Sequence, residues 1–406
     1  MTLRPAILLI ALVAALAMTP VAPEAGNIIY LAAGAVAIIL MRPSLAAFYR
    51  PIVWMPFGGL SLVLVAYTFA AGGVAGVLSV LYFAPFLAVW PLISLARADA
   101  GPEPAMVALL SLCGVAGAAA VAVGEFAATG TMRAGASVAN PIHFADVALA
   151  CGVLATIGAV YATGALRIIA LSGPVFAAAA VLLSGTRGAV VAFVAMAFTA
   201  LVLAVVLRAI SRRHFVMALV AAMAIIAALA LGAGQISGVQ RVVNDVKDLM
   251  QSELPAGNST NLRLQMYKGG LDAFVSSPVV GHGPFAYVAV AESSVGGSFE
   301  DAPHLHSDLA NFAASAGILG VLAYFLLLLA PLAEVFQNRR VVPKGLIIVV
   351  ASLTVGYLVM GLTNAMFGIL SVTVFFSTIC VVTGLLVERP ARQVPADQLE
   401  VAERVG

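Results

Sequence analysis

The chain has 406 residues, of which 63% are apolar and only 9% are charged. Soluble domains carry about 25% charged residues, so this composition excludes water as the main solvent of the folded chain. The formal net charge of +2 is too small to indicate a nucleic-acid partner, and no basic run with interleaved aromatic residues is present.

The sequence predicts an all-α integral membrane protein with about 12 transmembrane helices. Crossing the hydrocarbon layer takes about 20 mostly apolar residues per helix, and such runs recur along most of the chain. Residues 1–22 could be a secretory signal, but an uncleaved first helix fits the charge pattern better. The expected spans are approximately 5–22, 26–41, 54–71, 74–96, 104–127, 141–163, 166–183, 189–209, 215–233, 309–333, 345–363 and 367–387.

The placement of the basic residues indicates the orientation of these spans. With the N-terminus in the cytoplasm, fourteen of the twenty basic residues fall on the inside, as the positive-inside rule requires. The chain then divides into nine spans (1–233), a large periplasmic loop (234–308), three spans (309–388) and a polar cytoplasmic tail (389–406). Outside lie Arg133, Arg187, Arg241, Lys247, Arg263 and Lys268.

The connection 234–308 is the only predicted loop that is long enough to fold by itself. We expect a first helix over about 239–250 and a second that begins near Asn261 and ends at Ser277–Pro278. After it, the turn at Gly281–Pro284 introduces a stretch that we expect to be irregular. One face of the second helix carries Leu264, Tyr267, Leu271 and Phe274, and Arg263 and Lys268 flank that face.

His306 is the first candidate for chemistry, because it lies just before the tenth span. Ser307 or Asp308 is placed to cap that helix. The positive end of the helix dipole disfavours imidazolium, so a neutral His306 is able to accept a proton, and the same end attracts phosphate. On position alone, a histidine that simply lies wet at the membrane boundary is an equally good interpretation.

Arg187 is the second candidate, in the turn Ser184–Gly188 between two apolar spans. An arginine at such depth is costly unless it binds an anion or snorkels to lipid phosphates. Arg133 has a weaker claim, because its loop looks wet. Asn140 precedes the sixth span, where it either caps the helix or contacts substrate, and capping is favoured.

The sequence gives little support for a metal or a nucleotide. His304, His306 and Asp308 have enough ligand atoms for a divalent ion, but alternate residues just before a helix need an unusual loop to converge. No Asp-x-Asp pair, glycine-rich phosphate loop with lysine, or Gly-x-Ser-x-Gly elbow occurs. We therefore expect no metal and no cofactor.

Together these motifs resemble the O-antigen ligase and polymerase family. The resemblance covers about residues 130–335 and depends on the arginine turn, Arg263 on a loop helix, and His306–Ser307 followed after nine residues by Gly317. It implies a membrane glycosyltransferase in which His306 corresponds to the essential histidine, and Arg187 and Arg263 to two essential arginines. Tyr267 stands where the family often has tryptophan, and Val321–Leu322 where ligases often have threonines.

The implied reaction transfers a glycan from undecaprenyl diphosphate to an acceptor hydroxyl, with inversion at the anomeric carbon. Guanidinium groups bind diphosphate oxygens well, and a neutral histidine can take the hydroxyl proton. Further substrate contacts are expected from Arg133, Asn140, Tyr267, Lys268 and Ser307.

Several functions stay open at this point. The first is a ligase that joins the glycan to lipid A core at the periplasmic face of the bacterial inner membrane. Membrane lipids would surround such a protein. A polymerase that joins lipid-linked repeats uses the same donor, and transfer to protein hydroxyls is a third family function. A transporter is the alternative from another class, but no related halves are visible and the charged candidates gather at one face.

Overall fold

The computed structural model describes residues 3–41, 45–71, 73–96, 103–130, 133–209, 259–299 and 302–388, and in these ranges the protein is all helical. Ten of the helical stretches are long and apolar enough to cross a membrane. They coincide with ten of the expected spans, so a multi-pass membrane protein is confirmed. The expected first span corresponds to a shorter apolar helix, Leu3–Met18, and the expected span 215–233 and loop helix 239–250 lie outside the described residues.

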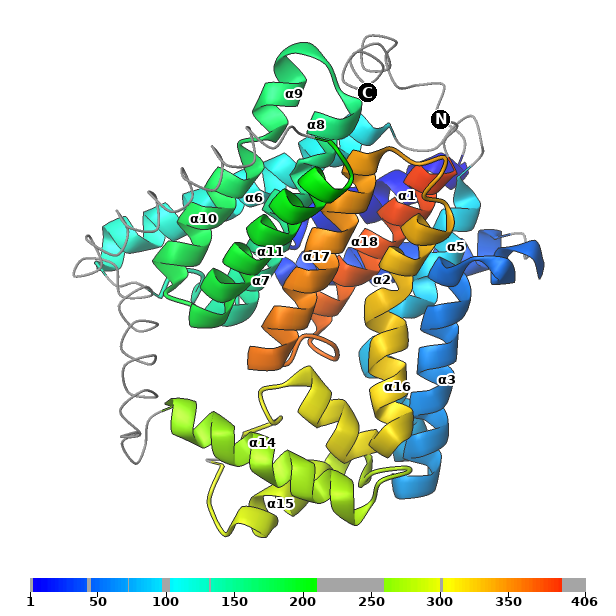
Figure 1. Ribbon diagram of the computed structural model, residues 1–406, viewed down its shortest axis with the longest axis vertical. Helices are drawn as coiled ribbons and strands as arrows, with labels where there is room; N and C mark the ends of the chain where they lie inside the picture. The colour runs from blue at the N-terminus through cyan, green and yellow to red at the C-terminus, as the bar shows by residue number, and fades with distance from the viewer. Residues whose placement is uncertain are drawn as a thin grey trace.

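The helices form an upper bundle and a smaller lower layer (Figure 1). In chain order the elements are α1 (Leu3–Leu12), η1 (Val13–Met18), α2 (Pro23–Leu40), η2 (Leu45–Tyr49), α3 (Pro51–Ala71), α4 (Gly73–Leu78), η3 (Ser79–Ala88), α5 (Val89–Leu95), α6 (Pro104–Thr129), α7 (Pro141–Ala155), α8 (Ile157–Tyr161), α9 (Gly164–Ala170), α10 (Gly173–Ser184), α11 (Arg187–Val206), α14 (Ser259–Ser276), α15 (Gly283–Val295), α16 (Asp308–Gln337), α17 (Lys344–Thr363) and α18 (Leu370–Val387).

The bundle is held together by long helix pairs, among them α3 with α16, α7 with α10, and α11 with α17. Its interior contains mostly aliphatic side chains and alanine, together with aromatic rings that meet edge-on around Phe367 and Phe376. In hydrocarbon every backbone polar group must be satisfied within the protein, and a helix achieves this within its own segment. This requirement explains why the long apolar runs of the sequence form helices in the structure.

The lower layer consists of α14, α15 and the first part of α16, packed around a small core of Met266, Ala273, Ala291, Phe299 and Leu305. The expected irregular stretch after Gly281 is wrong, because α15 occupies residues Gly283–Val295. Pro284 lies in its first turn, where the missing N–H costs nothing, and Gly296 follows its last residue with φ 61°. Proline at the start and glycine just past the end are the usual boundaries of a helix.

The second loop helix begins and ends as expected, but its packed face is not the one with the large apolar residues. Leu264 and Leu271 are exposed, whereas Met266 and Ala273 are buried together with Gly269 and Gly270. Small residues let α14 approach α15 and α16 closely, and this close approach decides which face is buried.

Helix α16 is broken at Gly317, where the expectation was one unbroken span over 309–333. Gly317 has φ 62° and ψ −148°, which is a backbone conformation open almost only to glycine. In Figure 1 the segment before the break belongs to the lower layer, and the segment after it rises beside α3. Backbone hydrogen bonds from Ile318 and Leu319 to Pro278 and Val279 join the break to the turn between α14 and α15.

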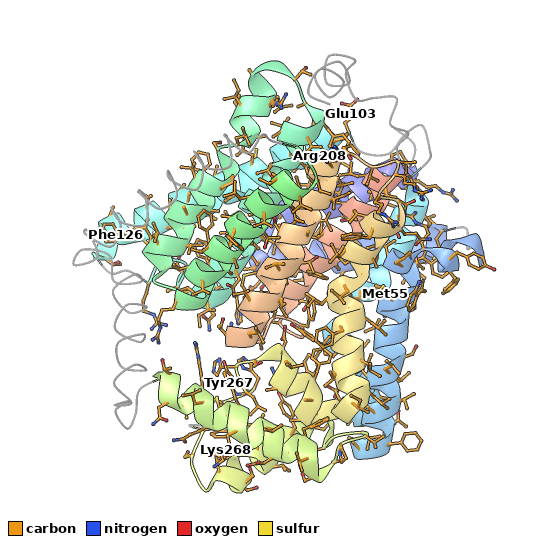
Figure 2. The ribbon with its side chains drawn as sticks, in the orientation of Figure 1. Met55, Glu103, Phe126, Arg208, Tyr267 and Lys268 are labelled. Atoms are coloured by element: carbon orange, nitrogen blue, oxygen red, sulfur yellow. The ribbon has the colours of Figure 1, made fainter. Side chains whose placement is uncertain are left out.

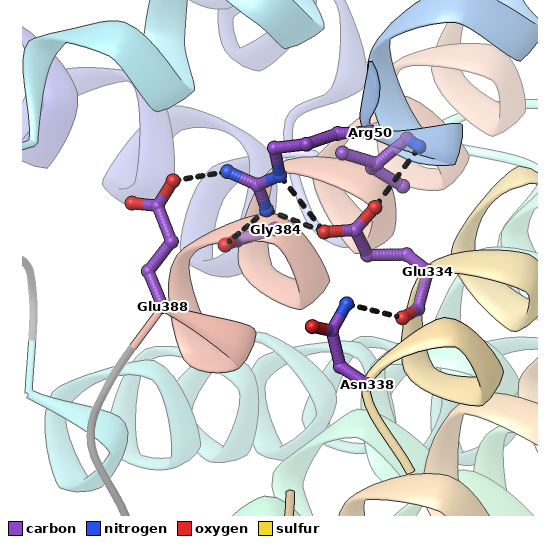
Figure 3. A network of polar contacts seen from close by, with 6 residues as sticks. Arg50, Glu334, Asn338, Gly384 and Glu388 are labelled. Atoms are coloured by element: carbon purple, nitrogen blue, oxygen red, sulfur yellow. Dashed lines mark hydrogen bonds and ion pairs between the residues drawn. The ribbon is translucent and has the colours of Figure 1, made fainter. Parts of the chain in front are cut away.

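The upper end of the bundle is closed by a buried ion pair (Figure 3). Arg50, just before α3, donates from Nε to Glu334 of α16 at 2.9 Å and also pairs with Glu388, which follows α18. The second carboxylate oxygen of Glu334 accepts from the Ile52 N–H at 3.2 Å. Because the Glu334 side chain is only 1% exposed, its charge depends on Arg50 for compensation.

We expect Arg50→Met to destabilise the protein by about 3–5 kcal/mol, because it leaves a buried carboxylate without its partner. Glu388→Gln is the matched control, since that side chain is 48% exposed and pairs of exposed charges contribute below about 1 kcal/mol. The apparent melting temperature in detergent measures both variants. Equal decreases for the two would contradict the assignment of Glu334 as the dependent charge.

Gly317→Ala should destabilise the protein much more than Gly296→Ala. A Cβ at Gly317 would lie 2.5 Å from the carbonyl carbon and oxygen of Val279, whereas one at Gly296 would meet nothing within 4 Å. Both glycines have positive φ, so the control carries only the left-handed strain of about 1–2 kcal/mol. Thermal unfolding of the two purified variants checks the difference, and similar melting temperatures would show that the break tolerates a side chain.

Candidate active site

The candidate site lies where the lower layer meets the lower ends of the bundle helices. Three connections of the bundle reach this place: the start of α7, the turn from α10 to α11, and the turn from α17 to α18. From the lower layer come α14 and the residues that lead into α16. Cross-connections between these segments include the Thr186 hydroxyl, 3.3 Å from Pro141 O, and the Tyr267 hydroxyl, 2.9 Å from Leu362 O.

His306 is held in a strained backbone conformation at the centre of this region. Its φ of 50° is unusual for a residue with a side chain, and such strain persists only where the surroundings fix it. The Tyr267 hydroxyl lies 3.2 Å from His306 O. Ser307, the next residue, caps α16 as predicted, because its side chain accepts from the Ala310 N–H. The imidazole is thereby placed at a defined point between α14 and α17.

Asn364 connects His306 with a second histidine. Its Oδ1 lies 3.2 Å from Nδ1 of His306, and its Nδ2 lies 3.3 Å from Nδ1 of His143 on α7. Asn364 is 3% exposed, while both imidazoles are half-buried. Three side chains from α7, from the residue after α17 and from the lower layer thus form one hydrogen-bonded row.

His304 stands edge-on to His306, with ring centroids 4.5 Å apart. Its Nδ1 accepts from the backbone N–H of His306 at 3.3 Å. In the neutral ring the proton must therefore be on Nε2, so His304 offers an N–H donor on its other side. This side chain is a further candidate for a substrate contact.

The two predicted arginines approach the same region from different helices. Arg187 is the first residue of α11, and its Nη1 lies 3.5 Å from the hydroxyl of Thr260, in the first turn of α14. Arg263 follows Thr260 by less than one turn of α14. Its positive charge acts on His304, His306 and Tyr267. Arg187 thus contacts the first turn of the helix that carries Arg263, and the charge of Arg263 reaches His306.

Burial and positive charge keep both histidines of the lower layer neutral. Burial is the main cause that lowers the pKa of His306, and the nearby Arg263 lowers it further, while the hydrogen bond to Asn364 acts in the opposite direction. For His304, burial and the neighbouring histidines lower the pKa to about 4. The sequence-based expectation of a neutral His306 gave the dipole of α16 as the cause, whereas burial is the largest cause here.

The remaining predicted residues have other positions. Asn140 caps α7, since its Oδ1 accepts from the Ile142 N–H at 3.0 Å. Lys268 is exposed, and Figure 2 shows it on the side of α14 that points away from the bundle, whereas Tyr267 points toward the bundle. Arg133 is exposed in the turn that precedes Asn140. Within the ranges that the structure describes, none of these three side chains contacts His306.

Asp308 binds backbone N–H groups of the protein and is not placed to bind a metal ion together with His304 and His306. Its carboxylate accepts from the backbone N–H groups of Met366 at 2.8 Å and Phe367 at 3.2 Å. It therefore turns away from His304 and His306 toward the loop after α17. Among the described residues, no group of three histidine, cysteine or acidic side chains converges as metal ligands would.

Sequence reasoning missed the row that His143 and Asn364 form with His306. The available signal was positional, because His143 lies in the first turn of one span and Asn364 directly after the end of another. Polar residues at such ends are common, and only the packing of α7 against α17 brings these two together.

The comparisons with known proteins agree with this site. A model of the family described as O-antigen ligase matches residues 173–325, a segment that contains Arg187, Arg263 and His306. No curated protein matches the chain. The fold defines a polytopic, all-helical membrane protein. Over residues 173–325 the chain is similar to the O-antigen ligase family, which confirms the resemblance seen in the sequence and supports an O-antigen ligase- or polymerase-type membrane glycosyltransferase.

Removing the charge of Arg263 should raise the pKa values of His304 and His306, because a nearby cation disfavours imidazolium. We expect this in Arg263→Gln and no such change in Lys268→Gln, which removes a charge from the same helix on the side away from the bundle. Histidine-labelled protein titrated by NMR measures both. With only five histidines in the chain, the resonances can be assigned by substitution, and equal titration curves in the two variants would refute the proximity of Arg263.

Proposed function

We propose that this protein transfers a glycan from undecaprenyl diphosphate to an acceptor hydroxyl at the periplasmic face of the bacterial inner membrane. The observation that carries the proposal is the convergence of Arg187, Arg263 and His306 at one end of the bundle. Arg187 comes from α11, Arg263 from α14 and His306 from the loop before α16. They are also the side chains to which the family resemblance gives roles in this reaction.

The chemistry follows from the charges. The acceptor oxygen attacks the anomeric carbon, the bond from that carbon to the diphosphate oxygen breaks, and lipid diphosphate leaves with the electron pair. Negative charge therefore develops on the leaving group, where the guanidinium groups of Arg187 and Arg263 stabilise it. The proton of the acceptor hydroxyl passes to neutral His306. A single displacement of this kind inverts the anomeric centre.

Lipid A core is the acceptor that we propose, which makes the protein an O-antigen ligase. The family description names that activity. The polymerase reaction differs only in its acceptor, a second lipid-linked repeat, and uses the same donor and the same arginines. The nature of the product separates the two functions.

The proposal is tested with the full chain reconstituted in lipid and supplied with a lipid-diphosphate glycan. Lipid A core and lipid-linked repeat are offered in separate reactions, and products are separated by mass. Core-linked product is expected, while a ladder of repeats would establish the polymerase instead. Absence of product with both acceptors from monodisperse protein would overturn the proposed transfer to these acceptors.

Substitutions assign the roles within that assay. His306→Ala should lower kcat by about 10²–10⁴-fold, as expected for loss of a general base. Arg187→Ala and Arg263→Ala should each lower it by about 10²–10³-fold through lost stabilisation of the leaving group. Arg339→Gln, an exposed arginine at the opposite end of α16, is the control and should leave kcat unchanged. Near-normal transfer by His306→Ala would rule out the general-base role.

A further inference from the structure

The Asn364 amide lies between two imidazole nitrogens, and it accepts a hydrogen bond on one side while it donates one on the other. One side of an amide accepts a hydrogen bond and the other donates. The Nδ1 atom that faces the amide oxygen must therefore carry a proton, and the Nδ1 atom that faces the amide nitrogen must not. His306 and His143, at 3.2 Å and 3.3 Å from this amide, consequently hold opposite tautomers.

In the structure the amide oxygen faces His306. Its Nδ1 then donates, and the lone pair of the neutral ring is left on Nε2. His143 accepts at Nδ1 from the amide nitrogen and carries its proton on Nε2. Of the two rings, only His306 has a basic nitrogen that is not used within the row.

The amide is held by a rigid loop. Asn364 directly follows α17, and the next residues are fixed where Met366 and Phe367 donate backbone N–H groups to Asp308. Gly368 N–H donates to the Thr373 hydroxyl at 3.0 Å. On the other side, the positive φ and the Tyr267 hydrogen bond fix the backbone of His306. Both partners of the hydrogen bond are thus positioned before any substrate binds.

We propose that Asn364 and His143 are positioning residues that select the Nδ1–H tautomer of His306, so that Nε2 is the atom that accepts the proton of the acceptor hydroxyl. This inference rests on the proposed transfer reaction for its consequence, but the tautomers themselves exist without it. Many catalytic histidines are oriented by a carboxylate, which also stabilises the imidazolium. A neutral amide orients the ring without placing a negative charge beside a site that has to bind diphosphate.

The tautomers can be observed directly. In ¹⁵N-histidine-labelled protein at neutral pH, the nitrogen shifts of His306 should show the proton on Nδ1 and those of His143 the proton on Nε2. Asn364→Ala should remove this fixed difference, so that His306 gains the Nε2–H form. A wild-type His306 with its proton on Nε2 would overturn the proposal, whatever the protein's activity.

Kinetics test the consequence. Asn364→Ala should lower kcat by about 10²-fold or more with little change in KM, since the base loses its orientation. His143→Gln retains an acceptor for the Asn364 amide and should keep most of kcat, whereas His143→Leu should lower it. Equal kcat for the two His143 variants, both with wild-type melting temperatures, would contradict a role of this row in orienting the base.

The pH profile separates orientation from simple loss of structure. Asn364→Asp places a carboxylate beside Nδ1, so the pKa of His306 should rise and the acid limb of kcat/KM should move to higher pH. The charge of Arg263 from α14 acts on His306. The other titratable groups near it are Tyr267 from α14, His143 from α7, which it reaches through Asn364, and His304 from its own segment. They are identical in both proteins, so an unchanged limb would overturn the proposal. If transfer proves insensitive to His306→Ala, the general-base role of His306 fails, while the NMR result still decides the tautomer.

Discussion

The hydrogen bonds between the Asp308 carboxylate and the backbone of Met366 and Phe367 hold the candidate site together. They join the segment that carries His304 and His306 to the loop that carries Asn364, across 58 positions of sequence. Asp308 is 1% exposed, and a buried carboxylate is tolerated only where donors satisfy it. Because both segments lack a helical backbone of their own at this point, this carboxylate fixes their distance, and with it the row from His306 to His143.

The two ends of the bundle use charge in different ways. At the upper end, Arg50 is compensated by Glu334 and Glu388, so its guanidinium is consumed in holding α3, α16 and α18 together. At the lower end, Arg187 lies beside the Thr260 hydroxyl, and the charge of Arg263 acts on His306. The upper guanidinium therefore serves the fold, whereas the lower two lie beside side chains of the candidate site.

The sequence was sufficient for most of the helices, and it singled out Arg187, Arg263 and His306 as site candidates. Long apolar runs dictate helices because lipid offers the backbone no partners, and an arginine between two such runs has few inert explanations. The break at Gly317 could not be predicted, since its cause is the approach of Val279 from another segment. The contacts of His143 and Asn364 could not be predicted either, because they depend on which helix ends pack side by side. The boundaries of α15 were present in the sequence as Pro284 and Gly296, but the glycine-rich turn before the helix favoured an irregular segment.

Arg263 connects binding with basicity in this arrangement. Burial lowers the pKa of His306 most, and the charge of Arg263 lowers it further, so the imidazole is a weaker base than a free one. A diphosphate bound by the arginines would offset that positive field, since interactions between charges a few ångströms apart are strong in a partly buried site. His306 would then become more basic when the donor is in place, and would remain unprotonated before it arrives. In the proposed reaction, donor binding would therefore let one arginine stabilise the leaving group and raise the basicity of His306. This requires that the base and the cation lie on neighbouring segments, as α14 and the residues before α16 do.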